Sequence, residues 1–345
     1  MTIRPLLDVT DLRVTFAVRR DGDMPWTPAR QLHAVGGVDF TLNPGETLGI
    51  VGESGSGKST LARALIGLVQ AQGRAEWVDG ADLIGMTPRQ MLKYRSDIQM
   101  IFQDPVASLN PRMTVGQIIA EPLTTHHPDL GRAEVKARVK SMMDKVGLLP
   151  NQINRYPHEF SGGQAQRIGI ARALIVEPRL IICDEPVSAL DVSIQAQVIN
   201  LLIRLQRDLG LALIFIAHDL SVVKHISDRV LVLYLGKVME IASAADLYSA
   251  PQHPYTQALM SAVPIPDPTV DAAKSVVPLT GDLPSPMNPP SGCVFRTRCP
   301  RAQPACAEQV PALMGGDHQV ACHFPGPLTE AEIAGARARA QTVPA

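Results

Sequence analysis

Nine consecutive residues, Gly-Glu-Ser-Gly-Ser-Gly-Lys-Ser-Thr, have the types and spacing needed to hold a chain of phosphates. They fit the pattern G-x-x-x-x-G-K-[ST], in which glycines let backbone N–H groups converge on an anion without Cβ clashes. Lys58 is expected to reach the β- and γ-phosphates of a nucleotide, and Ser59 to hold Mg²⁺. The alternative is a glycine-rich turn that binds nothing. The predicted phosphate loop consists of Gly52, Glu53, Ser54, Gly55, Ser56, Gly57, Lys58, Ser59 and Thr60.

A strand and a helix must flank this loop to aim its N–H groups. Residues 47–51 have the apolar character of a short buried strand, and residues 59–69 carry apolar side chains at helical spacing. The N-terminus of a helix adds a dipole that favours phosphate. Because strand, loop, Lys-Ser pair and helix occur in this order, the sequence favours phosphate binding over an inert turn.

A pair of acids follows a second apolar run. Residues 180–183 are typical of a parallel strand buried on both faces, and Asp184 and Glu185 come directly after it. Ligands of open α/β sheets bind where such strands end. We expect Asp184 to belong to the Mg²⁺ shell and Glu185 to orient and polarise a water for attack on the γ-phosphate. Many strands end in a solvated acid, so this interpretation depends on the phosphate loop upstream.

Four further motifs, taken with these two, resemble the ATP-binding cassette (ABC) family. Gln103, in Ile-Phe-Gln-Asp-Pro, is similar to the Q-loop glutamine of that family. Residues 160–164 resemble its signature motif, residues 188–191 resemble its D-loop, and His218 resembles its switch histidine. The resemblance implies an α/β fold: an ABC-type P-loop NTPase core with an N-terminal antiparallel β region and a helical subdomain.

The resemblance covers roughly residues 5–262 and implies a head-to-tail pair of cassettes with two ATP molecules at the interface. Each ATP would lie between the phosphate loop of one chain and the signature of the other. Residues 164–176 are predicted as a helix, whose N-terminus offers a second anion site suited to a partner's γ-phosphate. On the first chain, His218 would hold that phosphate and the water, while Gln103 would sense the phosphate and join the Mg²⁺ shell. The residues expected to act across the interface are Ser161, Gly162, Gly163, Gln164 and Asp191.

The family usually places an aromatic residue upstream of the phosphate loop to stack on adenine, and here the sequence departs from it. The one nearby candidate that we identify is Trp26, in a Pro-containing stretch that has the character of a loop between two strands. Trp26 either stacks on adenine or covers a patch of surface, because an exposed tryptophan serves both purposes.

Composition excludes some classes of protein. The chain has 345 residues, 46% of them hydrophobic, which suits one large α/β domain and a small one. No apolar run reaches the roughly 18 residues of a membrane span, and the N-terminus has no signal-peptide pattern. The expected location is therefore the cytoplasmic face of the membrane, with separate membrane subunits. The net charge of −1 argues against nucleic acid as the main partner.

Changes in composition divide the chain into four parts. A nucleotide-binding domain is expected at residues 1–250, with its helical subdomain at about 104–160. Prolines at a density that disfavours regular helix or sheet mark a linker at residues 251–290. A cysteine-rich extension at residues 291–325 and a tail at 326–345 complete the chain.

Four of the five cysteines lie in the extension, separated by 5, 6 and 15 residues: Cys293, Cys299, Cys306 and Cys322. Clustered cysteines in a chain of this kind favour metal over disulfides. The spacing lacks the C-x₂-C knuckles of structural zinc and is compatible with four thiolates around an iron–sulfur cluster. Zinc and free thiols remain alternatives. The fifth cysteine, Cys183, is interpreted as a small buried hydrophobe.

The extension resembles the C-terminal region of oligopeptide and dipeptide importer ATPases, on the strength of Gly-Cys-Val-Phe-Arg-Thr-Arg-Cys-Pro at residues 292–300 and Ala-Cys-His at 321–323. Residues 155–160 and 184–197 resemble the F-type of the two ATPase subunits of these importers. The resemblance implies that a [4Fe–4S] cluster can be carried there. We expect the interleaved Arg296, Arg298 and Arg301 to stabilise thiolates.

The resemblance favours an ATPase subunit that powers peptide import, paired with a different ATPase chain and two membrane-spanning permease subunits. An extracytoplasmic substrate-binding protein would deliver the cargo. Relatives of these importers carry nickel, glutathione or sugars, so the cargo stays open. A soluble ABC ATPase acting on nucleic acid or ribosomes is less favoured, because such proteins typically carry two cassettes, a long coiled coil or zinc modules within the cassette.

Overall fold

The structure is a computed structural model that describes residues 4–342, except 20, 21, 23, 25, 27, 264–275 and 280. Three of the expected linker prolines, Pro264, Pro266 and Pro268, lie outside the described residues, as do the last three residues of the expected tail.

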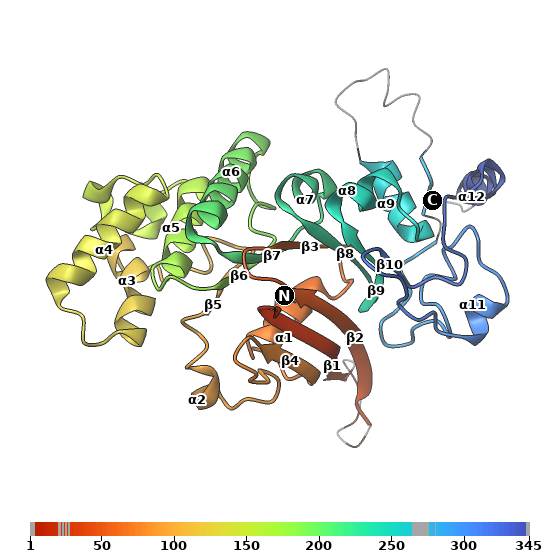
Figure 1. Cartoon of the computed structure of the whole chain (residues 1–345), viewed down its shortest axis with the longest axis horizontal. Coiled ribbons are helices and arrows are strands. Elements are labelled where there is room, and N and C mark those ends of the chain that lie inside the picture. The colour runs from red at the N-terminus through yellow and green to blue at the C-terminus, as the bar shows by residue number, and fades with distance from the viewer. Residues whose placement is uncertain are drawn as a thin grey trace.

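A seven-stranded sheet forms the centre of the molecule, with strand order β10-β9-β8-β3-β7-β6-β5 (Figure 1). Neighbouring strands from β5 to β8 are parallel, and β8, β9 and β10 pair antiparallel. Every residue of β3, β6 and β7 is buried, as expected for parallel strands covered on both faces. The strands are β3 (Thr47–Val51), β5 (Ile98–Ile101), β6 (Leu180–Asp184), β7 (Ala212–Ile216), β8 (Arg229–Tyr234), β9 (Lys237–Ser243) and β10 (Gln319–Val320).

Alternate residues of the central strands enter two separate cores. In β6, Ile181 and Cys183 pack into the core on one face, whereas Leu180 and Ile182 pack into the core on the other. This division follows from the two-residue period of a strand. Cys183 is thus a buried core residue, as the sequence predicted.

A second sheet of three antiparallel strands packs on one of these cores: β1 (Leu7–Val18), β2 (Arg30–Leu42) and β4 (Gln72–Trp77). It confirms the antiparallel region expected at the N-terminus. The helix α1 (Lys58–Leu65) lies between the two sheets, with Leu61 and Leu65 in the shared core. α1 is shorter than the helix predicted for residues 59–69, since the left-handed backbone of Gly67 follows its end.

Helices gather at one end of the molecule and over the other core (Figure 1). The arm at the left of Figure 1 contains α3 and α4, as expected for the helical subdomain, and α5 packs against both. Thr114 begins α3 with a capping box completed by Gln117. The helices are α2 (Pro88–Met91), α3 (Val115–His126), α4 (Arg132–Lys145), α5 (Gly162–Leu174), α6 (Val192–Leu209), α7 (Leu220–Ile226), α8 (Ala244–Ser249), α9 (Pro254–Ala262), α11 (Ala305–Glu308) and α12 (Glu330–Thr342), with single 3₁₀ turns at Pro150–Gln152 and Pro157–Glu159.

The expectation that proline keeps residues 251–290 free of regular helix is wrong at the start of that stretch, where α9 forms. Pro254 occupies the first turn of α9, where its missing N–H would have had no partner in any case. His253 caps the helix, because its Nδ1 accepts from the backbone N–H of Tyr255 at 3.0 Å. Burial lowers the pKa of His253 to about 3, which keeps the ring neutral and able to accept.

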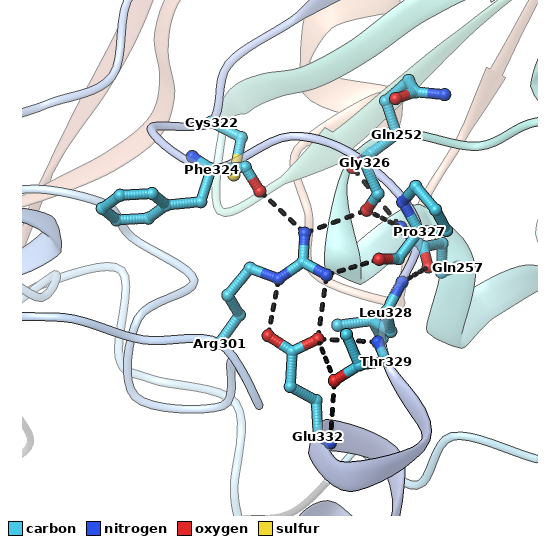
Figure 2. Close-up of polar contacts among 10 residues, drawn as sticks. All are labelled: Gln252, Gln257, Arg301, Cys322, Phe324, Gly326, Pro327, Leu328, Thr329 and Glu332. Atoms are coloured by element: carbon cyan, nitrogen blue, oxygen red, sulfur yellow. Dashed lines mark hydrogen bonds and ion pairs between the residues drawn. The ribbon is translucent and has the colours of Figure 1, made fainter.

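One arginine, Arg301, holds together separate segments of the C-terminal extension (Figure 2). Arg301 forms a two-pronged ion pair with Glu332 of α12, at 2.7 and 2.8 Å. Its guanidinium also donates to the carbonyl oxygens of Phe324, Gly326 and Pro327. The segment that follows Cys322 is thereby bound to α12, so Arg301 joins three parts of the extension that are distant in sequence.

The same segment is also bound to α9, which lies outside the extension (Figure 2). Gln257 donates to the carbonyl of Gly326 at 2.8 Å and accepts from the N–H of Leu328 at 2.7 Å. The Arg301 guanidinium lowers the pKa of Glu332 to about 2. A lowered folded pKa means that this carboxylate contributes stability above its unfolded pKa, and the contribution is lost only as the pH falls toward 2.

We predict that Arg301→Met loosens the extension, because five charge-assisted or carbonyl hydrogen bonds are lost and Glu332 is left unpaired. The local cost is expected to be about 3 kcal/mol. Hydrogen exchange of residues 322–332 should accelerate by roughly 100-fold, as follows from that free energy. Arg296→Met is the matched control, since the Arg296 side chain, within the described part of the chain, donates only to Ser291. Equal exchange in both variants would contradict this role of Arg301.

Candidate functional site

The phosphate loop connects β3 to α1, and close backbone packing dictates its glycines. A Cβ on Gly52 would lie 2.1 Å from the carbonyl oxygen of Leu233, and a Cβ on Gly57 would lie 2.2 Å from that of Ala34. Gly57 has a φ of 102° at the N-cap of α1, in the left-handed region that favours glycine. The first turn of α1 therefore presents backbone N–H groups at the end of β3, a geometry that binds phosphate.

Lys58 lies within its own loop. It is 5% exposed, and its Nζ donates to the carbonyls of Gly52 at 2.8 Å and Glu53 at 3.0 Å. Burial lowers the pKa of Lys58, while the carboxylates of Glu185, Asp184 and Glu53 act in the opposite direction. Phosphate oxygens at this position would replace two carbonyl acceptors with charged ones, which bind an ammonium more strongly.

Ser59 and Asp184 form the part of the site that fits a magnesium ion. The Ser59 hydroxyl donates to Oδ1 of Asp184 at 2.6 Å, so two of the three residues expected in the Mg²⁺ shell are in direct contact, whereas the third, Gln103, donates to Glu185. Asp184 is 1% exposed, and its Oδ2 has no hydrogen-bond partner among the described residues. The guanidinium of Arg63 is 4.0 Å from that oxygen. A buried carboxylate oxygen without a donor, beside a hydroxyl, suits the oxygen-liganded geometry of Mg²⁺.

Glu185 lies next to both polar residues expected to work with it. Gln103 donates from Nε2 to Glu185 Oε2 at 2.9 Å, and Nδ1 of His218 is 3.9 Å from the same oxygen. The three follow β5, β6 and β7, which are neighbours, so their side chains meet at one edge of the sheet. Glu185 has a φ of 47°, a strained conformation for a residue with a side chain. Glu185 and His218 also line a cavity of about 30 Å³, enough for a water molecule.

The signature and D-loop residues form a second group on the same chain. Ser161 caps α5, and a capping box joins it to Gln164. Gly163 packs on Ile194, next to Asp191, which caps α6 by accepting from the N–H of Ile194 at 3.1 Å. Among the described residues, no hydrogen bond or ion pair joins residues 161–164 to the phosphate loop. The second anion site of the chain therefore has its own position.

Trp26 and Phe16 are the two aromatic residues near the N-terminal strands that could meet an adenine. Trp26 is 78% exposed, in a turn of the connection between β1 and β2. Phe16 of β1 is 37% exposed and pairs across the sheet with Leu32. Leu32 is two residues, or about 7 Å of strand, from Ala34, whose carbonyl contacts Gly57 of the phosphate loop. The register thus pairs Phe16, which was not predicted as a site residue, with a part of β2 that leads to the phosphate loop.

The signal for Phe16 was present in the sequence. Leu12, Val14 and Phe16 alternate along one face of β1, and the first two are buried whereas the third is not. A large apolar residue left exposed at the end of a buried row is a candidate for ligand contact.

Four cysteines that are distant in sequence line one pocket. Cys293, Cys299, Cys306 and Cys322 surround it with Phe295, Phe324 and His253 among their neighbours. Burial raises the pKa of Cys293 and Cys322, and raises that of Cys299 to about 12. Within the part of the chain that the structure describes, no three His, Cys, Asp or Glu side chains are arranged to hold a single metal ion.

The expectation that three arginines stabilise thiolates is wrong for Arg298, whereas the backbone N–H of Arg296 does lower the pKa of Cys293. Arg296 donates to the carbonyl and hydroxyl of Ser291, and Arg298 pairs with Glu53 of the phosphate loop. Arg301 bonds to Glu332 and to backbone carbonyls, although its charge still lowers the pKa of Cys322. Ion pairs with carboxylates at short distance orient these guanidinium groups more strongly than neutral thiols do.

We predict that Glu185→Gln abolishes most ATP turnover and preserves ATP binding. The amide keeps the shape and the contact with Gln103 but cannot polarise a water, which should lower kcat by at least about 100-fold. Steady-state hydrolysis and equilibrium nucleotide binding measure the two effects. Glu177→Gln is the control, because Glu177 also has a positive φ, 53°, and lies at an exposed turn. If Glu185→Gln retained ATP turnover, the assignment of Glu185 as the residue that activates water would be contradicted.

We predict that Phe16→Ala weakens ATP binding by roughly 10-fold, because stacking of a base on an aromatic ring contributes about 1–3 kcal/mol. Trp26→Ala, in the exposed turn, should change it less. Titration of both variants with ATP and with inorganic triphosphate separates the base from the phosphates. A larger loss for Trp26→Ala would reverse the assignment.

Comparisons with known proteins agree on the family. The family model described as ABC transporter matches residues 35–188, and that described as oligopeptide/dipeptide transporter, C-terminal region, matches residues 239–306. The oligopeptide transport ATP-binding protein OppF of Escherichia coli is 65% identical over 94% of this chain and 97% of its own length. The protein of the same name from Salmonella typhimurium shows the same values. The putative oligopeptide transport ATP-binding protein YkfD of Bacillus subtilis is 51% identical over 93% and 95%.

Solved structures share the cassette fold. The ATP-binding cassette MJ0796, solved as a dimer bound to ADP and phosphate, matches with a TM-score of 0.61 and 26% identity, over 69% of this chain and 98% of its own. The cassette cbiO1 of Clostridium perfringens, part of an ABC transporter complex, matches with a TM-score of 0.60 and 28% identity, over 71% and 91%. No helix in the described ranges has the length and apolarity to traverse a bilayer. The chain belongs to the oligopeptide-transport ATP-binding proteins of the ABC transporter family.

Proposed function

We propose that this chain hydrolyses ATP to power the import of peptides through a membrane ABC transporter. The observation that carries the proposal is the edge of the central sheet where Lys58, Ser59, Asp184 and Glu185 meet, in a chain whose C-terminal region matches that of oligopeptide and dipeptide transporters. The fold supplies an anion site, a magnesium site and a carboxylate positioned for water, which are the parts that phosphoryl transfer needs.

In this proposal each residue of the nucleotide site has its own role in ATP hydrolysis. The phosphate loop and Lys58 bind the β- and γ-phosphates, and Ser59 and Asp184 hold Mg²⁺, which neutralises charge on the phosphates. Glu185 accepts a proton from the water that attacks the γ-phosphate, and His218, 3.9 Å from Glu185, fixes that phosphate and water. Gln103 is bonded to Glu185, so a change at the γ-phosphate is transmitted to the Q-loop.

A second cassette completes each nucleotide site in this proposal. Residues 161–164 and Asp191 lie at the exposed starts of α5 and α6, where helix N-termini can meet an anion on a partner. The MJ0796 cassette was solved as a dimer. The F-type resemblance favours a related but different chain as the partner, so we propose a heterodimer.

Two permease subunits are proposed to dock beside the Q-loop, on the cytoplasmic face of the membrane. A groove of about 360 Å³ runs there between the central sheet and the helical arm, lined by Met100, Phe102, Glu121 and Arg172 among others. Because apolar and charged side chains share its lining and Phe102 precedes Gln103, a helix of a permease seated in it would register the state of the nucleotide. An extracytoplasmic binding protein would then deliver the cargo to those subunits.

The four-part domain organisation is retained as a proposal: residues 1–250 with the helical subdomain at about 104–160, then 251–290, 291–325 and 326–345.

We further propose a [4Fe–4S] cluster at the four cysteines. Its support is a donor set of four thiols that face one pocket with aromatic walls. Because four thiolates are the usual protein ligands of such a cluster, we propose the cluster in preference to a single zinc ion.

Bound metal would also explain how buried thiols ionise. Burial raises the pKa of Cys293, Cys299 and Cys322, and iron replaces their protons when it binds. We predict four iron and four sulfide per chain after anaerobic purification, with a visible absorbance lost in Cys293→Ser and Cys306→Ser. Zinc without sulfide would contradict the cluster.

Peptide uptake tests the function directly. Cells that lack this chain should lose uptake of labelled di- to pentapeptides, the intact chain should restore it, and Glu185→Gln should not. Glu177→Gln serves as the control that restores uptake. Unchanged uptake of every peptide would contradict the peptide cargo and redirect the search to nickel, glutathione or sugars.

A further inference from the structure

A residue of the C-terminal extension reaches the phosphate loop. Nη1 of Arg298 lies 2.7 Å from Oε2 of Glu53, the second residue of that loop, across 245 positions of sequence. The Arg298 side chain is 8% exposed, and Glu53 is partly covered as well. Ion pairs this short and this far from solvent are screened little by salt or water.

An aromatic cluster holds the arginine in that position. The Arg298 guanidinium lies over the ring of Tyr234, 5.9 Å from its centroid, and Nη1 approaches the Tyr234 hydroxyl at 3.4 Å. Tyr234 packs edge-on against Tyr255 and Phe295, with centroid distances of 4.8 and 5.3 Å. Phe295 is fully buried, between Cys293 and Arg298 in the chain. The fold of the extension therefore sets the position of Arg298.

The loop is held at the same residue from a second direction. The backbone N–H of Glu53 donates to the Tyr255 hydroxyl at 3.0 Å. Tyr255 of α9 therefore binds the main chain of Glu53, and Arg298 binds its side chain. Two residues of the proline-dense stretch lie nearby. Leu283 would be 3.8 Å from a Cβ on Gly55 of the phosphate loop. The Pro286 carbonyl accepts from the N–H of His33 in β2 at 3.3 Å. The second half of the proline-dense stretch thus contacts both the phosphate loop and β2.

Glu53 presents a problem for a site that binds phosphate. Its carboxylate is close enough to Lys58 to favour the charged ammonium, so it is also close to any phosphate that Lys58 binds. An unpaired anion there would repel ATP. Arg298 cancels that charge, and the planar fork of a guanidinium fixes the direction of the carboxylate as well.

We propose that Arg298 is a positioning residue of the nucleotide site, which neutralises Glu53 and fixes the phosphate loop from the C-terminal extension. ATP affinity then depends on the folded extension, and the four-cysteine segment supports the ATP site in addition to any metal it holds. This inference rests on the proposed ATPase function. The partner of Arg298 is this chain's own loop, so the effect exists in each subunit before any dimer forms.

The test is equilibrium binding of a fluorescent ATP analogue with Mg²⁺ to the purified full-length chain. Arg298→Gln should raise the Kd about 10-fold, because Glu53 is left unpaired beside the phosphates. In steady-state hydrolysis it should raise KM for ATP and leave kcat nearly unchanged. Arg296→Gln, two residues away, is the matched control and should behave as the unaltered chain, because among the described residues the Arg296 side chain donates only to Ser291.

The double variant Glu53→Gln/Arg298→Gln distinguishes neutralisation from general structural damage. Removal of the Glu53 charge should restore the Kd to within about 3-fold of the unaltered chain, because two residues in one ion pair do not act additively. A double variant as weak as Arg298→Gln alone would overturn the proposal, and so would an unchanged Kd for Arg298→Gln.

Glu53→Gln alone provides a measurement on a chain in which the buried arginine is intact, in case Arg298→Gln does not fold. The amide oxygen introduced by this substitution still accepts from Arg298, and the guanidinium charge is no longer cancelled. Binding should therefore be as tight as in the unaltered chain or tighter, and weaker binding would contradict the proposal. If the unaltered chain binds no ATP, the proposed function itself fails. If it binds and Arg298→Gln binds equally, only this inference fails.

Discussion

Parallel strands buried on both faces must all end at one edge of their sheet, and the charged residues of the nucleotide site depend on that constraint. β3, β5, β6 and β7 deliver the phosphate loop, Gln103, Glu185 and His218 to the same edge, although these residues are far apart in sequence. Their side chains reach one another because the strands before them are neighbours about 4.8 Å apart. The apolar packing on both faces of the sheet thus also orders the polar groups.

The site carries strain and charge that the surrounding structure must balance. Glu185 adopts a left-handed backbone, Lys58 is buried, and one oxygen of Asp184 has no donor. A strained backbone and a buried polar atom without a partner each cost stability, so the apolar packing around the site must offset them.

The C-terminal extension packs against the central sheet and the phosphate loop. β10 adds to the central sheet beside β9, and the Ala321 N–H donates to the carbonyl of Met239. Gln257 of α9 and Arg301 hold the last segment (Figure 2), while Arg298 reaches the phosphate loop. A segment that begins after a proline-dense stretch is thus anchored at three places on the cassette.

Much of the nucleotide site was determined by the sequence itself, because its signals are short-range. A phosphate loop between an apolar strand and a helix, an acid pair after a buried run, and a capping Ser161 or Asp191 each depend on residues within a few positions. The strand predicted at residues 47–51 has the observed bounds, and that at 180–183 extends by one residue. The helix α9 was missed because proline at the first position was read as a breaker.

Only the tertiary structure decided which distant residues meet. The register of β1 against β2 brought Phe16 to Leu32, and an aromatic cluster turned Arg298 away from the cysteines toward Glu53. The four cysteines likewise reach one pocket only because residues 293–322 fold back on themselves. Arg301 holds the end of that segment by donating to the carbonyl of Phe324. No periodicity or spacing in the sequence predicts such contacts, because the direction of a side chain is set by its packing and by the nearest opposite charge.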